Sequence, residues 1–241
     1  MAREPKVPKL EPIAPRVWLL RGGAMRTMNA YLIEDDDGVV VFDTGEKGMA
    51  PAIAAAGARL GGITRVVLGH GDTDHRGSAP ALSKVAPVAC HPDAVAQAEG
   101  SGGRDYWDMS KLPPAIRLLH RFLHRFVWDG GPVRISGTVR GGDRIAGFEV
   151  VELAGHAPGQ IGLWRESDRV ALASDTVYLT TMTGRATDAH VPQEAYNLDT
   201  VEARASIGRL AALDPLVVGV GHLGPMRGSG VRAELERAAA G

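Results

Sequence analysis

The sequence has 241 residues, of which 44% are hydrophobic and 23% are charged, and its formal net charge is −1. This length allows one large domain or two small ones, and the balanced charge gives no support for a nucleic-acid or membrane partner. The single cysteine, Cys90, excludes an internal disulfide framework and argues against a thiolate zinc cluster. The start of the chain lacks the apolar core of a signal peptide, so we expect a cytoplasmic protein.

The first part of the chain alternates apolar strands with polar turns. Residues 1–15 are rich in proline and lysine and predict an extended arm. Strands are predicted at residues 17–21, 29–33 and 39–42. The last of them is fully apolar and ends at Asp43. A carboxylate at this point either orients a metal-bound histidine or caps the following turn and helix, and the sequence leaves both roles open.

The next stretch carries the strongest chemical signal. An alanine-rich segment at 49–60 predicts a helix, and the strand at 66–68 runs into a loop with four candidate metal ligands, His70, Asp72, Asp74 and His75. Burying two imidazoles and two carboxylates without a cation would be costly, and the end of a strand holds ligands stiffly while leaving room for substrate. The loop therefore predicts a metal site; the alternative is a polar turn that contains two histidines.

Residues 110–128 predict a helix, because apolar side chains recur there at helical spacing. The basic side chains fall largely on the other face: Arg117, His120, Arg121, His124 and Arg125. We interpret them as a solvated basic face, since no acid lies between His120 and His124 to complete a metalloprotease-like motif. The predicted strand at 87–90 ends at His91, which we interpret as a helix-start or surface histidine and not as a ligand.

The second half repeats one design, in which an apolar strand ends at a candidate ligand. The three ligands are His156, Asp175 and His222. Residues 180–197 predict a polar loop with an exposed His190. Asp199 predicts the cap of a helix that runs to residue 213, and a terminal helix is predicted at 231–240.

Five segments resemble in order the motifs of the metallo-β-lactamase-fold hydrolases, in particular the glyoxalase II and lactonase-like branch: VVVFDTG, HGDTDHRGS, AGHAPGQIGLW, ASDTVY and VGVGHLGP. The resemblance covers about residues 17–223. It implies an α+β fold, a four-layer αββα sandwich, as a single domain over 1–241. Residues 1–15 would be an N-terminal arm, and about 104–130 a helical, lid-like insertion near the active site.

The resemblance also implies a ligand set. The first metal position would use His70, Asp72 and His156, the second would use Asp74, His75 and His222, and Asp175 would bridge them. Asp74 would also orient the attacking hydroxide, and Asp43 would support a ligand histidine. Tyr178 would either face the substrate carbonyl or pack under the lid. The implied reaction is attack of a metal-bound hydroxide on an ester, lactone or thioester of a small molecule.

Asp72 departs from the family pattern, because it stands where the second histidine of His-x-His-x-Asp-His is usual. Two divalent ions are expected, with zinc favoured and iron or manganese as alternatives because carboxylate ligands suit them. If the shorter Asp72 fails to reach the metal, one ion would bind at the second position. Gln160 stands where many members have a further histidine that is not a core ligand.

Three other functions compete with the hydrolase. The His-x-acid-x-Asp-His pattern resembles the flavodiiron proteins, which reduce oxygen or nitric oxide, but 241 residues leave no room for their flavodoxin-like domain. A β-lactam hydrolase is a second alternative, and a scaffold that only binds its ligand is a third. The expected partner is a small-molecule substrate, without nucleic acid or membrane, and a homo-oligomer is left open.

Overall fold

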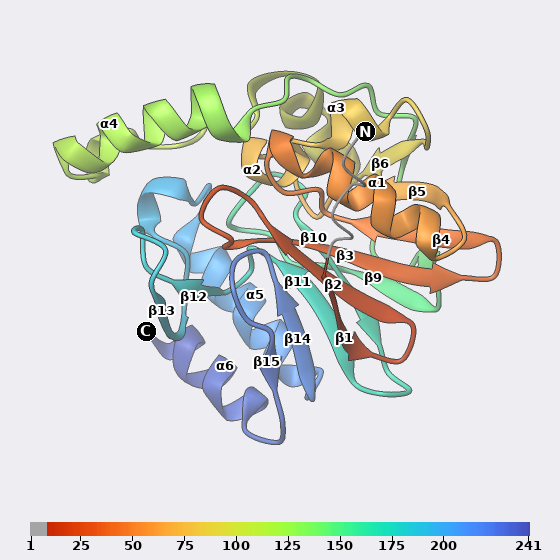
Figure 1. Ribbon diagram of the computed structural model, residues 1–241. Helices are drawn as coiled ribbons and strands as arrows, with labels where there is room; N and C mark the ends of the chain where they lie inside the picture. Colours follow the sequence, from red (N-terminus) through yellow and green to blue (C-terminus); the bar gives the residue numbers. More distant parts are fainter. Residues whose placement is uncertain (1–8) are drawn as a thin grey trace.

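Two β-sheets face each other and helices cover their outer sides in the computed structural model, which describes residues 9–241 (Figure 1). The first sheet follows chain order: β1 (Leu10–Ala14), β2 (Val17–Gly22), β3 (Met28–Asp35), β4 (Gly38–Phe42), β5 (Ile63–Val67), β6 (Val88–Cys90) and β7 (Gly137–Thr138). The order in the second sheet is β15 (Met226–Arg227), β14 (Val217–Val220), β11 (Val170–Ser174), β10 (Ile161–Arg165), β9 (Phe148–Glu152) and β8 (Arg144–Ile145).

Alternation along the strands explains why both faces of the first sheet are buried. In β3, Leu32 points into the core beneath the helices, whereas Ile33 points into the core between the sheets. In β4, Val41 points into the core beneath the helices and Phe42 points into the core between the sheets. Successive side chains of a strand point to opposite faces, so a continuous apolar run is the pattern of a strand covered on both sides.

Helices form the two outer layers. The first sheet is covered by η1 (Lys47–Met49), α1 (Ala50–Arg59) and α3 (Ala79–Leu82), and the second by α5 (Thr200–Ala212) and α6 (Val231–Ala240) (Figure 1). A third core lies under α5 and α6, where Ile207 and Leu235 pack against Val218 of the sheet. Three cores separate four layers, which confirms the predicted α+β class and αββα sandwich.

Two predicted irregular segments contain strands. Residues 10–14 of the predicted arm form β1, which pairs with β2 and buries Ile13; residues 1–8 lie outside the described part of the chain. Pro12 is compatible with β1 because that strand lies at the sheet edge. The predicted loop at 180–197 instead holds a hairpin of β12 (Tyr178–Thr180) and β13 (Ala186–His190), followed by η6 (Glu194–Tyr196). His190 is half-buried there, opposite Tyr178, and is not the exposed loop residue that we predicted.

The segment between β6 and β7 is helical throughout much of its length. It contains η2 (Pro92–Ala94), η3 (Gln97–Ser101), η4 (Met109–Lys111), α4 (Pro114–Leu123) and η5 (His124–Trp128). α4 extends away from the sandwich at the upper left of Figure 1. No helix in residues 9–241 is long and apolar enough to cross a membrane.

We predicted that the basic side chains of this helical segment form a solvated face, and this prediction is wrong for the two histidines. His120 and His124 are buried, whereas Phe122 and Phe126 are exposed. His120 packs among aromatic rings, with centroids 5.0 Å from Trp107, 5.1 Å from Trp128 and 5.4 Å from Tyr196. Helical periodicity separates the faces, but the neighbouring elements decide which face turns inward.

Candidate metal centre

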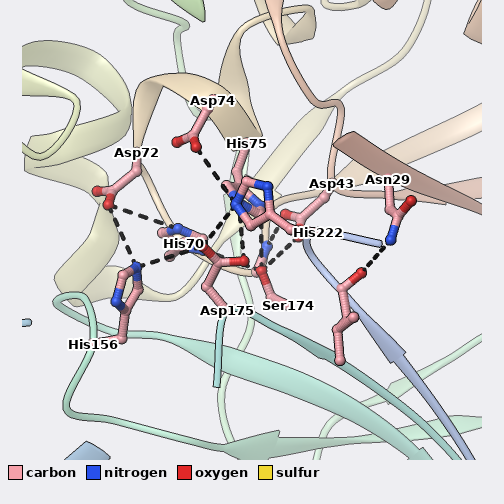
Figure 2. Close-up of polar contacts among 12 residues, drawn as sticks. Asn29, Asp43, His70, Asp72, Asp74, His75, His156, Ser174, Asp175 and His222 are labelled. Atoms are coloured by element: carbon pink, nitrogen blue, oxygen red, sulfur yellow. Dashed lines mark hydrogen bonds and ion pairs between the residues drawn. The ribbon is translucent and has the colours of Figure 1, made fainter. Parts of the chain in front are cut away.

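The candidate ligands gather at one edge of the sandwich because the strands that deliver them end there. β4 and β5 run parallel in the first sheet, as do β11 and β14 in the second. β4 leads to Asp43, β11 to Asp175 and β14 to His222, while β5 leads to the loop and to α2 (Thr73–Arg76). Figure 2 shows these side chains converging from both sheets.

A contact between the sheets fixes the position of His222. The Asn29 side chain donates a hydrogen bond to the Val220 carbonyl at 2.8 Å, and the Tyr31 hydroxyl donates to the same oxygen at 2.6 Å. Met28 at the start of β3 forms an isolated bridge with His222. The end of β14 is therefore attached to the first sheet, which brings its histidine to the ligands of the other half.

Three groups of donor atoms lie close together here; one joins Asp43 to His70 and His75, and the other two are the candidate metal-binding clusters. In the first of these clusters, donor atoms of His70, His156 and Asp175 lie within 4.8 Å of one another, and in the second, those of Asp74, His75 and His222 do so. Asp175 belongs to the first cluster and also contacts the histidines of the second. Its Oδ1 is 3.2 Å from His75 Nε2, and its Oδ2 is 3.2 Å from His222 Nε2 and 3.7 Å from His156 Nε2.

The donor set fits divalent cations. His70 Nε2 is buried and has no hydrogen-bond partner among the described residues, although it faces the other ligands. Buried polar atoms are normally paired, so an unpaired imidazole nitrogen among carboxylates is the arrangement expected of a metal ligand. Imidazole nitrogens and carboxylate oxygens suit zinc, iron and manganese.

The electrostatics of the cluster follow from burial and from close opposite charges. Burial raises the pKa of Asp175, but the neighbouring His222 and His75 outweigh burial and hold this pKa well below its usual range. Burial lowers the pKa of His75, whereas Asp175 and Asp43 outweigh that effect and raise it well above the ordinary value. Burial lowers the pKa of His70, which favours the neutral imidazole that binds metals.

Asp43 contacts a ligand histidine. Its Oδ2 lies 3.1 Å from His75 Nδ1, and it accepts a hydrogen bond of 2.6 Å from the Ser174 hydroxyl. Its Oδ1 accepts a hydrogen bond of 2.7 Å from the Gly69 amide. The structure therefore shows the histidine contact and no side-chain cap on the following helix η1. Asp43 and Ser174 both have left-handed backbones, with φ of 56° and 48°.

Sequence reasoning missed two residues that hold ligand histidines. The Ser174 hydroxyl lies 3.1 Å from His70 Nδ1, and the Asn197 Oδ1 lies 3.0 Å from His156 Nδ1. A contact with Nδ1 leaves Nε2 of each ring to face the site. Ser174 directly precedes Asp175, so its position at the end of an apolar strand could have marked it from the sequence. Asn197 lies 41 residues from His156, and nothing in its local sequence marks it.

Asp72 belongs to neither cluster of donor atoms. Its Oδ2 is 3.7 Å from His70 Nε2 and 3.8 Å from His156 Nε2. The Tyr106 hydroxyl instead contacts both carboxylate oxygens at 2.7 and 2.6 Å, and Trp107 Nε1 donates to Oδ2 at 3.3 Å. Burial raises the pKa of Asp72 to about 8, and the hydrogen bond from Tyr106 acts in the opposite direction. No sequence pattern indicated a role for either aromatic residue.

Five of the candidate ligands line a solvent-open cavity: Asp72, Asp74, His156, Asp175 and His222. Tyr178 lines the cavity and its hydroxyl donates to Asp175 Oδ2 at 2.9 Å. The other walls include side chains from α4–η5, the hairpin after β11 and the turn before β3: His120, Leu123, Val127, Trp128, Thr180, Met182, Met25 and Met28. Glu46, which sequence reasoning also missed, lines the cavity and accepts a hydrogen bond of 2.6 Å from the Ala24 amide.

Two predicted non-ligands lie outside the clusters. Gln160 donates to the Thr176 hydroxyl at 2.8 Å. His91 begins the helix η2, where its Nδ1 accepts from the Asp93 amide at 3.2 Å. It is buried and is therefore a helix-start histidine, not a surface one.

This fold and its histidine–aspartate clusters characterise the metallo-β-lactamase superfamily, whose family model matches residues 26–222, and the chain belongs to that superfamily. Among curated proteins, it is 24% identical to the "Probable metallo-hydrolase YqjP" of Bacillus subtilis (strain 168), over 86% of this chain and 70% of that protein. It is 36% identical to the "Probable metallo-hydrolase YflN" of the same organism, over 34% of this chain and 33% of that protein. These relatives support a hydrolase activity in general terms.

Solved structures share the fold. A metallo-β-lactamase family protein from Thermus thermophilus, TTHA1429, superposes with a TM-score of 0.67 at 24% identity, over 95% of this chain and 80% of that chain. A β-lactamase domain protein from Burkholderia ambifaria gives 0.68 at 20% identity, over 99% and 76%. TTHA1623, solved in a di-iron-bound form, gives 0.63 at 24% identity, over 89% and 96%.

Proposed function

We propose that this protein is a metal-dependent hydrolase that cleaves an ester, lactone or thioester with an apolar acyl portion. The observation that carries the proposal is the arrangement of two donor clusters around one shared carboxylate, Asp175, at the wall of a largely apolar cavity. Superfamily membership supports divalent metal binding, and both curated relatives are named as probable metallo-hydrolases.

Seven residues would take part in binding metal. His70 and His156 would hold one ion, Asp74, His75 and His222 would hold the second, and Asp175 would contact both; Asp72 faces the first position. A bound ion would supply Lewis-acid chemistry, which polarises a carbonyl and lowers the pKa of a coordinated water to about 7. In TTHA1623 a related fold is seen with two irons, which supports a dinuclear site here and keeps iron beside zinc as an occupant.

The protein's own groups would then place the substrate and guide its proton transfer. Asp74 lines the cavity with its carboxylate 3.6 Å from His222 Nε2, where it can accept a hydrogen bond from the attacking water and orient it. Tyr178 borders the same space, and its hydroxyl can turn from Asp175 to donate to a carbonyl oxygen of the substrate. Fixed donors of this kind stabilise charge that develops on that oxygen.

The walls of the cavity favour a neutral acyl substrate over a β-lactam. No lysine or arginine lines the cavity among the described residues. A β-lactam antibiotic carries a carboxylate, which a binding site usually pairs with a cation. The arginines of α4–η5 do not reach the cavity lining, whereas Leu123 and Val127 of the same segment do.

Elemental analysis and a substrate panel would test this proposal together. The protein is purified without added metal, its metal content per chain is measured, and hydrolysis of aryl esters, lactones, thioesters and a chromogenic β-lactam is compared. We expect close to two ions per chain and activity on the first three classes. Asp175→Ala and His156→Ala should each abolish activity while retaining the circular-dichroism spectrum of the parent protein, and Val201→Ser on the exposed face of α5 is the matched control.

Three results would contradict the proposal. Full activity of either ligand variant would exclude the site as the catalytic centre. Two irons per chain with oxygen consumption from an electron donor, and no hydrolysis, would replace it with the redox alternative. Activity on the β-lactam alone would retain the metal site but exclude the substrate class proposed here.

A further inference from the structure

The segment α4–η5 has an inner face and an outer face that differ in their surroundings. The inner face carries His120, Leu123 and Val127, which line the cavity. The outer face carries four large apolar side chains that remain exposed: Leu118 at 70%, Leu119 at 42%, Phe122 at 55% and Phe126 at 56%. Large apolar residues that cluster on an exposed face usually mark an interaction surface.

A row of arginines borders this apolar face. Arg117, Arg121 and Arg125 are spaced four residues apart and therefore lie along one side of the helix. The Arg125 guanidinium lies 5.6 Å from the centroid of the Phe126 ring, and the Phe122 and Phe126 rings are 5.2 Å apart. The sequence from 109 to 128 contains no aspartate or glutamate, so this segment supplies no acid of its own to balance the row.

The position of the helix leaves its outer face available. α4 extends away from the sandwich (Figure 1), and the two exposed phenylalanines are more than half accessible to solvent. The inner face meanwhile borders the candidate active site. One helix therefore has an exposed apolar and cationic outer side and a cavity-lining inner side.

We propose that the outer face of α4–η5, comprising Leu118, Leu119, Phe122, Phe126 and the three arginines, docks onto an anionic lipid surface. A helix with aromatic and leucine residues on one stripe and arginines beside it lies in the plane of a membrane interface, with its apolar stripe among the acyl chains and its cations at the phosphates. The near-neutral charge of the whole chain predicted no membrane partner, but this helical segment carries three arginines and no acid. Such docking is independent of which bond the enzyme cleaves.

Charge complementarity favours lipid over a second copy of the chain. A symmetric dimer brings the same surface of both copies together. A dimer centred on the outer face of α4–η5 would place two arginine rows close to each other, and the segment has no acid to pair with either row. An anionic bilayer offers phosphates to the arginines and acyl chains to the apolar stripe, and no rearrangement of the sandwich is needed.

Vesicle co-sedimentation of the full chain tests the proposal. The protein is mixed with vesicles of phosphatidylcholine alone or with added phosphatidylglycerol, and the pelleted fraction gives a partition coefficient. We expect binding that grows with anionic lipid and falls with salt. Phe122→Ser with Phe126→Ser should lower the coefficient at least about ten-fold, because apolar burial in the interface is lost. Arg117→Gln, Arg121→Gln and Arg125→Gln together should lower it on the order of 100-fold, at about five-fold for each arginine.

Matched controls separate this surface from general effects. Val201→Ser with Val85→Ser removes exposed apolar side chains elsewhere, and Arg59→Gln, Arg65→Gln and Arg140→Gln together remove the same number of exposed charges elsewhere. Both controls should bind vesicles like the parent protein, and all variants should keep its thermal melting temperature within a few degrees. Absence of binding to anionic vesicles, or equal losses in the controls, would overturn the proposal. A third outcome would also overturn it. The parent protein would form a concentration-dependent dimer and bind no vesicles, and the phenylalanine variant would be a monomer.

Discussion

The hydroxyl of Tyr106 spans both carboxylate oxygens of Asp72, at 2.7 Å from Oδ1 and 2.6 Å from Oδ2. The residue that departs from the family's ligand pattern is thus held by an aromatic side chain from the helical segment between β6 and β7. Asp72 still faces His70 and His156 at 3.7 and 3.8 Å, so the hydrogen bond fixes a carboxylate next to the first donor cluster.

Removing the Tyr106 hydroxyl should destabilise the metal-free protein. In Tyr106→Phe the buried carboxylate of Asp72 loses its main donor, and an unsatisfied buried polar group costs about 1–3 kcal/mol. We therefore expect the free energy of unfolding to decrease by this amount, as measured by urea denaturation in the presence of a chelator. In an Asp72→Asn background the same substitution should cost less, which a double-mutant cycle measures. Tyr196→Phe is the control, because no hydrogen bond of that hydroxyl occurs among the described residues. Equal losses in both backgrounds would show that the two side chains are not coupled.

Restoring an imidazole at position 72 should strengthen metal binding. Asp72→His adds a third histidine beside His70 and His156, and we expect zinc affinity at the first position to rise about ten-fold or more, since imidazole is a preferred zinc ligand. Competition with a chromogenic chelator measures the change. Asp72→Asn keeps the shape of the side chain but removes its charge, and it serves as the matched variant. Unchanged zinc binding in the histidine variant would place residue 72 outside the ligand set.

Asp43 should contribute to metal affinity through His75 without contacting the ion. Asp43→Asn retains an oxygen for the Gly69 amide but weakens the contact with His75 Nδ1. Loss of such a supporting carboxylate typically lowers metal affinity by roughly 10- to 100-fold, and we expect a decrease on the order of 10-fold at the second position. Chelator competition with this variant is compared with Asp36→Asn, whose side chain is exposed at the β3–β4 hairpin. An equal decrease of metal affinity in Asp36→Asn would show that the effect does not depend on the contact between Asp43 and His75.

His120 should make the fold sensitive to mild acid. Burial lowers the pKa of His120 to about 4, from an ordinary value of 6.5. Because the folded state binds this proton less readily than the unfolded state, the associated stability is complete above pH 6.5 and is lost as the pH falls toward 4. The shift corresponds to roughly 3 kcal/mol at about 1.36 kcal/mol per pKa unit.

Thermal melting from about pH 7.5 to about pH 4.5 measures this dependence. His120→Phe preserves an aromatic ring among Trp107, Trp128 and Tyr196 but cannot take up a proton. We expect the variant to lose less stability than the parent protein across the acid half of this range, and to match it within about 1 kcal/mol at about pH 7.5, as conservative core substitutions do. Parallel pH profiles for the two proteins would exclude His120 as the source of acid sensitivity.

The fold class and the strand ends that deliver the candidate ligands could be predicted from local sequence. The strand predicted at 39–42 lies within β4, because apolar runs between turn signals depend on local chemistry and on the short period of a strand. The clustering of His156, Asp175 and His222 with the loop after β5 was foreseen through the order of motifs, since histidines and acids at strand ends are chemically specific.

The hydrogen bonds that hold the candidate ligands, and the side chains that line the cavity, depend on contacts that the linear sequence does not display. Tyr106 and Asp72 are 34 residues apart, and Asn197 and His156 are 41 apart, so neither pairing leaves a local pattern. The inward rotation of His120 and the exposure of Phe122 depend on which elements pack against α4 and not on the helical period itself. Propensity and periodicity act within a turn or a strand pair, whereas these contacts arise from packing between segments that are distant in the chain.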